Sequence, residues 1–291
     1  MKILVTGAEG QLGTAIRKKA DVFSDFSFLF TDINELDITD PEAVEDFFDR
    51  ERPDFIVNCA AYTAVDVAEK DDELVSVLNA GVPAFLGKIG RDYHCRVIHL
   101  STDYVFDGNN CTPYTEADLV NPESVYGRTK LNGEIALIKA NSSALIIRTS
   151  WLYSLTGNNF LNTMIRMGRE REALKVVYDQ VGTPTFAGDL AETILTIISK
   201  TEKNPTIWHS GIYHYSNEGV CSWYDFAQSI MELLTIPCQV HPVITAEYPT
   251  TAKRPAYSVL NKSKIKRIFG IDIPYWRDSL KTCITELIDN V

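Results

Sequence analysis

The sequence predicts an α/β fold, namely a Rossmann-type doubly wound parallel sheet with a smaller C-terminal substrate-binding domain. Two observations predict it. A short apolar run at residues 3–5 leads directly into a glycine-rich turn that contains Gly7, Gly10 and Gly13. Short apolar segments then alternate with helical segments through the first half of the chain. Strands that are buried on both faces and alternate with helices are typical of a parallel sheet with helices on either side.

The glycine-rich turn indicates that the chain binds a nucleotide cofactor. Gly7 permits a sharp turn, Gly10 lets a pyrophosphate approach the backbone, and Gly13 lets the following helix pack close to the strand. The N–H groups at the start of that helix attract phosphate. The spacing is Gly-x-x-Gly-x-x-Gly instead of the tighter Gly-x-Gly-x-x-Gly, but its place directly after an apolar strand favours dinucleotide binding.

The other elements of the first half follow from apolar runs and helix signals. Four further segments are expected to be strands, at residues 26–30, 55–57, 97–100 and 144–147. Thr39 to Glu42 has the capping side chain, the proline and the acid of a helix start, and Pro53 ends that helix. Residues 72–92 are expected to be mostly helical. The candidate core residues of this segment are Leu74, Leu78, Phe85, Leu86 and Ile89.

The second half of the chain is less regular. We expect a helix at 158–167, a loop or strand at 176–185, and a helix that begins in a capping box at Ser222. The last helix carries apolar residues at helical spacing, namely Leu280, Cys283, Ile284, Leu287 and Ile288. We assign residues 1–150 to the NAD(P)-binding Rossmann domain, with later segments that complete the sheet. Residues 151–291 are assigned mainly to a discontinuous substrate-binding part.

Composition and charge exclude several classes of function. The net charge of −11 argues against nucleic acid as a partner. No apolar run reaches the ~18 residues that cross a bilayer, so no membrane contact is expected. The six cysteines are scattered without a Cys-x-x-Cys pair, which predicts free thiols and a cytoplasmic location. The five histidines show no ligand spacing, so no metal is predicted.

Tyr126 and Lys130 lie four residues apart and would share one face of a helix. A lysine ammonium beside a phenol lowers the pKa of the phenol, which lets a tyrosine exchange a proton near neutral pH. Alone, the pair is better explained as an exposed helix pair. Ser101 and Thr102, however, directly follow a predicted strand, and a parallel sheet binds its ligands at that end. The glycine-rich turn, the hydroxyl groups and the Tyr-x-x-x-Lys pair, in that order, are together far more specific.

In these segments the chain resembles the extended short-chain dehydrogenase/reductases and, more closely, the dTDP-4-dehydrorhamnose reductases. The resemblance covers the whole chain. Its most characteristic parts are Ser-Thr-Asp-Tyr-Val-Phe and Asp-Gln-x-Gly-x-Pro-Thr, which are typical of this subfamily and not of dehydrogenases in general. The matching segments are residues 5–13, 58–66, 100–108, 125–134, 148–151, 157–160, 179–185 and 254–255.

The resemblance implies roles for individual residues. In the catalytic triad, Thr102 would hold the sugar carbonyl, Tyr126 would protonate it, and Lys130 would tune Tyr126 and bond the nicotinamide ribose. The residues expected to bind the cofactor are Gly7, Gly10, Gln11, Leu12, Gly13, Asp32, Asp37, Ile38, Ala61, Tyr62, Thr63, Leu100, Tyr126 and Lys130. The residues expected to contact the sugar nucleotide are Val65, Thr102, Asp103, Tyr104 and Trp151. Val65 and Trp151 could instead belong to the core, and Asp103 could cap a turn.

The resemblance also implies a reaction. This is the NAD(P)H-dependent reduction of the C4 ketone of dTDP-4-dehydro-β-L-rhamnose, a dTDP-4-keto-6-deoxy-L-hexose, to dTDP-L-rhamnose. One alternative is a nucleotide-sugar epimerase, which would keep its cofactor bound, or a reductase of another 4-keto sugar. Another alternative is a non-catalytic regulatory subunit that resembles that of methionine adenosyltransferase. The intact Thr102, Tyr126 and Lys130 weigh against a non-catalytic role.

We predict that NADH is preferred, with NADPH also used. Asp32 at the end of the second strand can accept both ribose hydroxyls of NADH and repels a 2′-phosphate, and Glu9 adds negative charge. Arg17 and Lys18 are expected to face away. A homodimer is possible. The magnesium site that some relatives place at a dimer contact is not expected, because Ala15 stands where they have an acidic residue.

Overall fold

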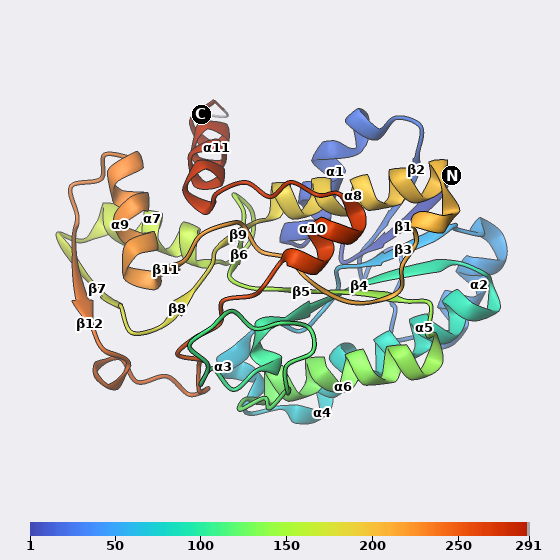
Figure 1. Cartoon of the computed structure of the whole chain (residues 1–291), viewed down its shortest axis with the longest axis horizontal. Coiled ribbons are helices and arrows are strands. Elements are labelled where there is room, and N and C mark those ends of the chain that lie inside the picture. The colour runs from blue at the N-terminus through green and yellow to red at the C-terminus, as the bar shows by residue number, and fades with distance from the viewer. Residues whose placement is uncertain (290–291) are drawn as a thin grey trace.

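The computed structural model describes residues 1–289, and its centre is a six-stranded parallel sheet (Figure 1). The order of the strands is β10-β5-β4-β3-β1-β2. Their bounds are β1 (Lys2–Thr6), β2 (Ser27–Thr31), β3 (Phe55–Asn58), β4 (Arg96–Thr102), β5 (Leu145–Thr149) and β10 (Gly211–His214). The chain runs outward from β1 to β2 on one side and from β3 to β5 on the other. The predicted doubly wound α/β fold is confirmed, and its switch point lies between β1 and β3.

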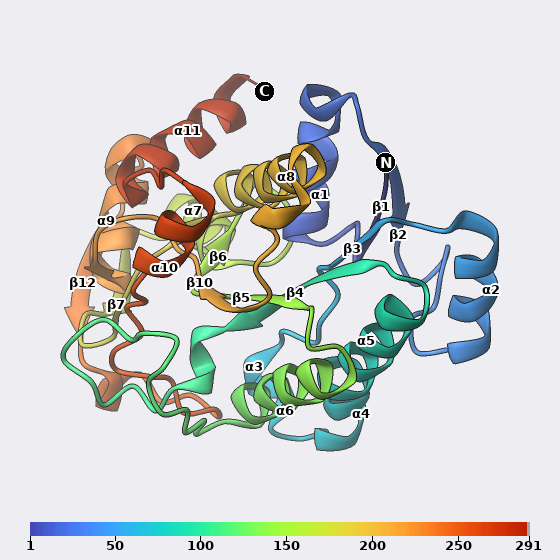
Figure 2. The ribbon, with the colours of Figure 1, turned by 45° about the vertical axis from the view of Figure 1, so that its right-hand side comes forward.

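Helices cover both faces of the sheet (Figure 2). One face packs against α1 (Gln11–Lys19), α8 (Ala187–Lys203) and α10 (Ser263–Phe269), and the other against α2 (Pro41–Glu51), α5 (Val82–Asp92) and α6 (Val125–Ala140). Alternate residues of a strand serve the two cores. Ile3 and Val5 pack beneath α1 and α8, whereas Leu4 lies in the core with α2 and α5. This alternation explains why Ile3, Leu4 and Val5 are apolar at three successive positions.

The helix signals of the first half hold with one correction. Asp40 caps α2 by accepting the N–H groups of Glu42 and Ala43, as the sequence predicts. Residues 72–92, however, do not form one regular helix. They divide into α4 (Asp72–Ser76), a π-helical turn (Val77–Gly81) and α5. Leu86 and Ile89 are buried, but Leu74 is 50% exposed, so its assignment to the core is wrong.

A second unit, to the left in Figure 1, surrounds a core of its own. It contains α7 (Phe160–Glu170), α9 (Trp223–Leu233) and α11 (Trp276–Asp289). Its strands form three pairs, namely β6 (Leu152–Tyr153) with β9 (Thr185–Phe186), β7 (Ala173–Val177) with β12 (Gln239–Val243), and β8 (Val181–Gly182) with β11 (Cys221–Ser222). The capping box at Ser222 is confirmed. In the last helix Leu280 is buried, but Ile288 is 60% exposed, so it does not belong to the core.

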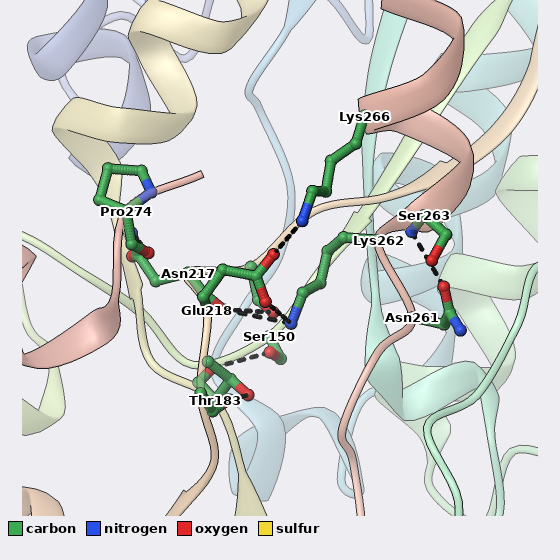
Figure 3. Close-up of polar contacts among 11 residues, drawn as sticks. Ser150, Thr183, Asn217, Glu218, Asn261, Lys262, Ser263, Lys266 and Pro274 are labelled. Atoms are coloured by element: carbon green, nitrogen blue, oxygen red, sulfur yellow. Dashed lines mark hydrogen bonds and ion pairs between the residues drawn. The ribbon is translucent and has the colours of Figure 1, made fainter. Parts of the chain in front are cut away.

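A polar network holds α10 to the loop that follows β10 (Figure 3). Lys266 Nζ lies 2.8 Å from Glu218 Oε1, and Lys262 Nζ lies 3.5 Å from Glu218 Oε2. Lys262 also donates to the carbonyl oxygen of Asn217 at 3.3 Å. This loop leads from the sheet into the second unit, so the network fixes the point at which the chain crosses between them.

Across residues 1–289, no helix combines the length and the apolar character that a membrane span requires.

Candidate active site

The glycine-rich turn joins β1 to α1 and needs glycine for two different reasons. Gly7 has a φ of +63°, in the left-handed region, and a Cβ there would lie 2.8 Å from Ala60 Cα. A Cβ on Gly13 would lie 2.5 Å from Ala8 Cα, because α1 packs directly on the turn. Gly10 precedes α1 as its N-cap. The Leu12 side chain is in the core, so only its backbone N–H can face a pyrophosphate.

A cavity of about 580 Å³ opens at the carboxyl ends of β1, β2 and β3. Of the residues expected to bind the cofactor, Gly7, Gly10, Asp32, Asp37, Ile38 and Ala61 line it. Glu9, expected to add negative charge there, lines it as well. The sequence reasoning missed Thr31, Ile33, Leu36, Thr39, Cys59, Ala60, Leu74 and Leu78 as lining residues. A cavity lined by the start of a helix and by carboxylates suits the adenosine and pyrophosphate parts of a dinucleotide.

Asp32 and Asp37 are held at the rim of this cavity by nearby hydrogen bonds. Asp32 Oδ2 accepts the N–H of Glu9 at 3.0 Å, and Oδ1 accepts the N–H of Ile33 at 2.9 Å. Each carboxylate oxygen has a second lone pair, which leaves it able to accept from a ribose hydroxyl. Asp37 Oδ1 accepts from the hydroxyl and the N–H of Thr39, and these bonds lower the pKa of Asp37.

The structure corrects the expectation that Arg17 faces away from the site. Its guanidinium carbon lies 4.2 Å from the centroid of the Phe30 ring on β2. With Ala8, Glu9, Thr14, Phe30 and Glu35 it lines a cavity of about 490 Å³, which shares Glu9 with the cofactor cavity. Lys18 instead pairs with Glu286 at 3.6 Å. A cation therefore lies close to the predicted ribose site.

Gln11, the first residue of α1, is fixed by a loop from the second unit. Its Oε1 accepts from Asn159 Nδ2 at 2.9 Å and from Ser154 Oγ at 3.2 Å. Asn159 also caps α7 by accepting the N–H of Asn162 at 3.0 Å. Because both bonds engage the oxygen of the Gln11 amide, its nitrogen remains the group that can face a ligand at the start of α1.

Thr102, Asp103 and Tyr104 follow the end of β4. The Thr102 hydroxyl donates to Asp103 Oδ1 at 3.0 Å and accepts the N–H of Tyr104 at 3.2 Å. Burial raises the pKa of the Asp103 carboxyl to about 6. The Tyr104 ring meets the Tyr126 ring edge-on, with 5.5 Å between centroids. The structure thus brings three predicted substrate residues next to the predicted proton donor.

Tyr126 and Lys130 lie near the start of α6, on one face as predicted. Ser124 caps this helix by accepting the N–H of Gly127 at 3.1 Å. The helix approaches the Thr102 turn closely because Gly127 has no side chain, since a Cβ there would collide with the carbonyl oxygen of Tyr104. Lys130 is buried, and its Nζ donates to the Leu100 carbonyl oxygen at 2.6 Å.

The pKa values of this pair differ from the sequence-based expectation. Burial raises the pKa of Tyr126 to about 12, although hydrogen bonding with Thr102 lowers it in part. Burial also lowers the pKa of Lys130 to about 8, which the charge of Glu134 opposes. A phenol with a raised pKa stays protonated at neutral pH. The arrangement therefore suits a tyrosine that donates a proton to substrate.

The comparisons with known proteins agree with this geometry. A family model described as the RmlD substrate binding domain matches residues 1–288. The chain belongs to the RmlD substrate-binding domain family. A curated relative, the dTDP-4-dehydrorhamnose reductase of Aggregatibacter actinomycetemcomitans, is 39% identical over 287 residues, which are 96% of this chain and 97% of that protein.

Solved structures of related proteins extend the similarity over the whole fold. A dTDP-4-dehydrorhamnose reductase from Clostridium acetobutylicum is 43% identical, with a TM-score of 0.93 over 99% of this chain and 100% of the other. The dTDP-4-dehydrorhamnose reductase of Bacillus anthracis, solved in complex with NADP, is 36% identical, with a TM-score of 0.92 over 98% and 99% of the two chains.

In this member of the RmlD substrate-binding domain family, Trp151 lies between the two units. Its ring stacks on Trp223 of α9, with 3.6 Å between centroids and 10° between planes. Gly182 makes room for it, since a Cβ there would lie 2.6 Å from Trp151 Cε2. The ring therefore packs against the core of the second unit, which agrees in part with the alternative that Trp151 belongs to the core. Its contact with a sugar nucleotide stays a prediction.

Asn79 is a site residue that sequence reasoning missed. It lies in the π-helical turn, is buried, and accepts the N–H of Tyr62 at 2.9 Å. Its amide nitrogen donates to the Tyr62 carbonyl oxygen at 3.1 Å and to Thr129 Oγ1 at 3.2 Å. It therefore holds the segment expected to line the nicotinamide side against α6. No motif marks it, because its role depends on an irregular helical turn.

Asp66 and Arg254 tie a loop of the second unit to the sheet. They belong to matching segments of the sequence, but no role was assigned to either. Arg254 Nη2 lies 2.5 Å from Asp66 Oδ2, and the Ala252 N–H donates to Asp66 Oδ1 at 3.0 Å. The bond from Arg254 lowers the pKa of Asp66. Val65, a predicted substrate residue, directly precedes Asp66 at the start of α3 (Val65–Ala68). Arg254 also lines a cavity of about 460 Å³ that extends along this loop.

Proposed function

We propose that the protein reduces the C4 ketone of dTDP-4-dehydro-β-L-rhamnose to dTDP-L-rhamnose with NAD(P)H, as a step of dTDP-rhamnose biosynthesis. The observation that carries the proposal is full-length similarity to dTDP-4-dehydrorhamnose reductases at about 40% identity, joined to an intact Thr102, Tyr126 and Lys130. Thr102 ends β4, and Tyr126 and Lys130 lie near the start of α6. The cavity at the carboxyl ends of β1, β2 and β3 suits the adenosine and pyrophosphate parts of the cofactor.

The site residues take the following roles in the proposal. Bound NAD(P)H supplies the hydride that C4 of the sugar receives. The Thr102 hydroxyl turns its proton from Asp103 to the O4 oxygen and orients the carbonyl. Tyr126, protonated at neutral pH, gives its proton to O4 as negative charge develops there. Lys130 is held by the Leu100 carbonyl oxygen on the same face of α6 as Tyr126, and in the proposal its charge stabilises the phenolate that remains.

One experiment separates this proposal from its alternatives. The purified protein is incubated with the dTDP-4-keto sugar and NADH or NADPH, the loss of absorbance at 340 nm is followed, and the product is identified by NMR. We expect stoichiometric oxidation of added cofactor and formation of dTDP-L-rhamnose. Protein that carries tightly bound NAD and oxidises no added cofactor would instead be an epimerase. Absence of turnover with any 4-keto sugar nucleotide would favour the regulatory subunit.

We also propose that NADH is preferred over NADPH. Asp32 can accept both ribose hydroxyls. Glu9 and Glu35 add negative charge around the cavity of about 490 Å³ that Arg17 lines. Arg17 on the Phe30 ring acts in the opposite sense, because a guanidinium can pair with a 2′-phosphate. Permissive use of NADPH is therefore part of the proposal.

Paired variants test the cofactor preference. We expect kcat/KM to be higher with NADH. Asp32→Ala should lower the ratio of kcat/KM with NADH to kcat/KM with NADPH, because it weakens NADH binding and removes the repulsion of the NADPH 2′-phosphate. Arg17→Ala should raise this ratio. A clear preference of the unaltered protein for NADPH would overturn our interpretation of Asp32.

A homodimer and a cytoplasmic location are further proposals that rest on the sequence. Light scattering coupled to size-exclusion chromatography would show whether the mass in solution is twice the chain mass of 32.6 kDa.

A further inference from the structure

A line of buried polar side chains leads from the sheet to Lys130. Thr6 on β1, Asn58 on β3 and His99 on β4 are register partners on neighbouring strands, and each is 1% exposed. Thr6 Oγ1 lies 2.8 Å from Asn58 Oδ1, and Asn58 Nδ2 lies 3.0 Å from His99 Nδ1. The other ring nitrogen, His99 Nε2, lies 3.5 Å from Lys130 Nζ. The reaction proposed above uses Lys130 only.

The direction of the hydrogen bonds in this line is fixed by a backbone group. The N–H of Ala60 points at Asn58 Oδ1, 3.2 Å away. A backbone N–H can only donate, so the atom it faces is the amide oxygen of Asn58, and the amide nitrogen is the one that meets His99. His99 Nδ1 must then be an acceptor and carries no proton. The neutral ring has its proton on Nε2, and an imidazolium would set two donors against each other.

The Nε2–H group of His99 also distinguishes the charged form of Lys130 from the neutral form. An ammonium has only donors, so it cannot form a hydrogen bond with the Nε2–H group of His99, whereas a neutral amine offers a lone pair to it. The other charged groups around Lys130 do not change this. Glu134 faces it from the same helix and raises its pKa, but Glu134 is held by Arg148 of β5, with Nη2–Oε2 at 2.7 Å. Burial and the charge of Lys130 lower the pKa of His99 well below its usual range.

We propose that His99 is a positioning residue that stabilises neutral Lys130 by donating its Nε2–H to the lysine nitrogen. This rests on the proposed reduction. When Tyr126 has given its proton to the sugar oxygen, a proton moves from the Lys130 ammonium to the phenolate. One N–H bond breaks and one O–H bond forms. The lone pair left on Nζ accepts from His99, and a proton from water then restores the ammonium.

A first test measures the tautomer and needs no substrate. The protein is labelled with ¹⁵N-histidine, and long-range ¹H–¹⁵N correlation spectra are recorded between pH 6 and 9. The His99 signals are assigned from their loss in His99→Gln. We expect Nε2 to be protonated and Nδ1 unprotonated throughout. A proton on Nδ1, or a charged ring near neutral pH, would overturn the proposal. This result is independent of whether the protein reduces a dTDP sugar.

A second test measures the pH dependence of kcat. Lys130 loses its charge as the pH rises through about 8, so kcat of the unaltered protein should fall there. His99→Leu removes the opposing N–H group and keeps the site apolar, so the fall should move to higher pH by up to about one unit. His99→Gln restores an N–H donor of similar reach and should return the profile toward that of the unaltered protein. KM for the sugar nucleotide should not change, because His99 does not reach it.

The controls make a negative result decisive. Melting temperatures identify variants that fail to fold. The tautomer measurement on the unaltered protein still decides in that case, because the His99 signals can be assigned from their loss in either His99→Gln or His99→Leu. A His99→Leu profile that superimposes on that of the unaltered protein would show that His99 has only a structural role. Failure of the proposed function would give a different pair of results. No form of the protein would reduce the dTDP sugar, but the spectra would still show the Nε2–H tautomer of His99.

Discussion

The two units of the molecule hold their part of the site by different means. In the sheet unit, built from the six-stranded sheet and the helices that cover it, the predicted site residues lie at strand ends and helix starts, where the backbone places them. In the second unit, side chains do this work. Trp151 stacks on Trp223, and Phe160 lies 4.5 Å from Trp223 and 5.6 Å from Phe226, measured between ring centroids.

This difference indicates how changes in each unit should act. A backbone scaffold tolerates the loss of a reacting side chain, so such a variant should lose turnover and keep its fold. Stacked rings do not allow activity and stability to be changed separately, because a ring that could face the substrate also fills the core. Variants of the reacting residues in the sheet unit should therefore separate chemistry from stability, and variants of the stacked rings in the second unit should not.

The largest effect is expected from Tyr126→Phe. The ring and its edge-on contact with Tyr104 remain, but the proton donor is lost. We expect kcat to fall about 10²–10⁴-fold, with a melting temperature close to that of the unaltered protein. Steady-state kinetics and thermal unfolding measure both quantities. Near-normal turnover would contradict the mechanism, and a large loss of stability would break the contrast between the units.

Glu134→Gln tests how much the buried ion pair of Glu134 and Arg148 contributes to the stability of the sheet unit. Glu134 accepts from Arg148 Nε at 2.9 Å and Nη2 at 2.7 Å, and both side chains are almost fully buried. Removing one charge leaves the other buried without its partner, which costs about 3–5 kcal/mol of unfolding free energy. The exposed pair of Arg166 and Glu170 is the matched control, because Glu170→Gln should cost at most about 0.5 kcal/mol. Urea unfolding distinguishes them.

Trp151→Ala tests whether one ring of the second unit contributes to both stability and substrate binding. A fully buried Trp→Ala change costs about 3–5 kcal/mol, and roughly half of that is expected here because the ring is only half-buried. We expect a lower melting temperature together with a higher KM for the sugar nucleotide. Trp208, which packs on Phe55 in the sheet unit, is the control. Trp208→Ala should lower stability without a change in KM. An unchanged KM in Trp151→Ala would refute its contact with substrate.

The pair Gly13→Ala and Gly10→Ala is expected to separate two positions of the same turn. A Cβ on Gly13 meets the backbone of Ala8 at 2.5 Å, so α1 must shift, whereas the nearest atom to a Cβ on Gly10 is the Gly7 carbonyl oxygen at 3.2 Å. We expect a loss of about 1–3 kcal/mol for Gly13→Ala and clearly less for Gly10→Ala. Gly10→Ala should mainly weaken NADH binding, measured by fluorescence titration. Equal stability losses would show that the turn is not the close contact described above.

Much of the sheet unit could be predicted because its signals are local. The strand of residues 3–5, the cap at Asp40 and the Tyr-x-x-x-Lys pair are each specified within a few residues of sequence. The second unit was harder, because its strands pair over long distances. β7 pairs with β12, which follows roughly 60 residues later, and β8 and β9 have two residues each. Such pairings leave no periodic pattern in a short window.

The features of the site also divide into those that local sequence predicts and those that depend on packing. Glycine spacing and strand ends predicted the cofactor turn and the residues around Thr102. In the structure the turn lines the cofactor cavity, and Tyr104 contacts Tyr126. The direction in which Arg17 points, and the burial of the Trp151 ring against Trp223, depend on what packs beside them. The raised pKa of Tyr126 has the same origin, since burial is a property of the folded chain. Sequence spacing carries no information on these points.

The late arrival of β10 has a consequence for how the protein is made. β5 ends at Thr149, and the strand that pairs with its outer edge begins at Gly211. At the usual speed of synthesis, ~5–20 residues per second, the intervening stretch takes a ribosome roughly 3–12 seconds. During that time the backbone N–H and C=O groups along this edge have no partner strand, and such an edge is a template for pairing with another chain. Until β10 is made, the nascent protein therefore has an open sheet edge at β5 on which another chain could pair, and its own later segment then closes that edge.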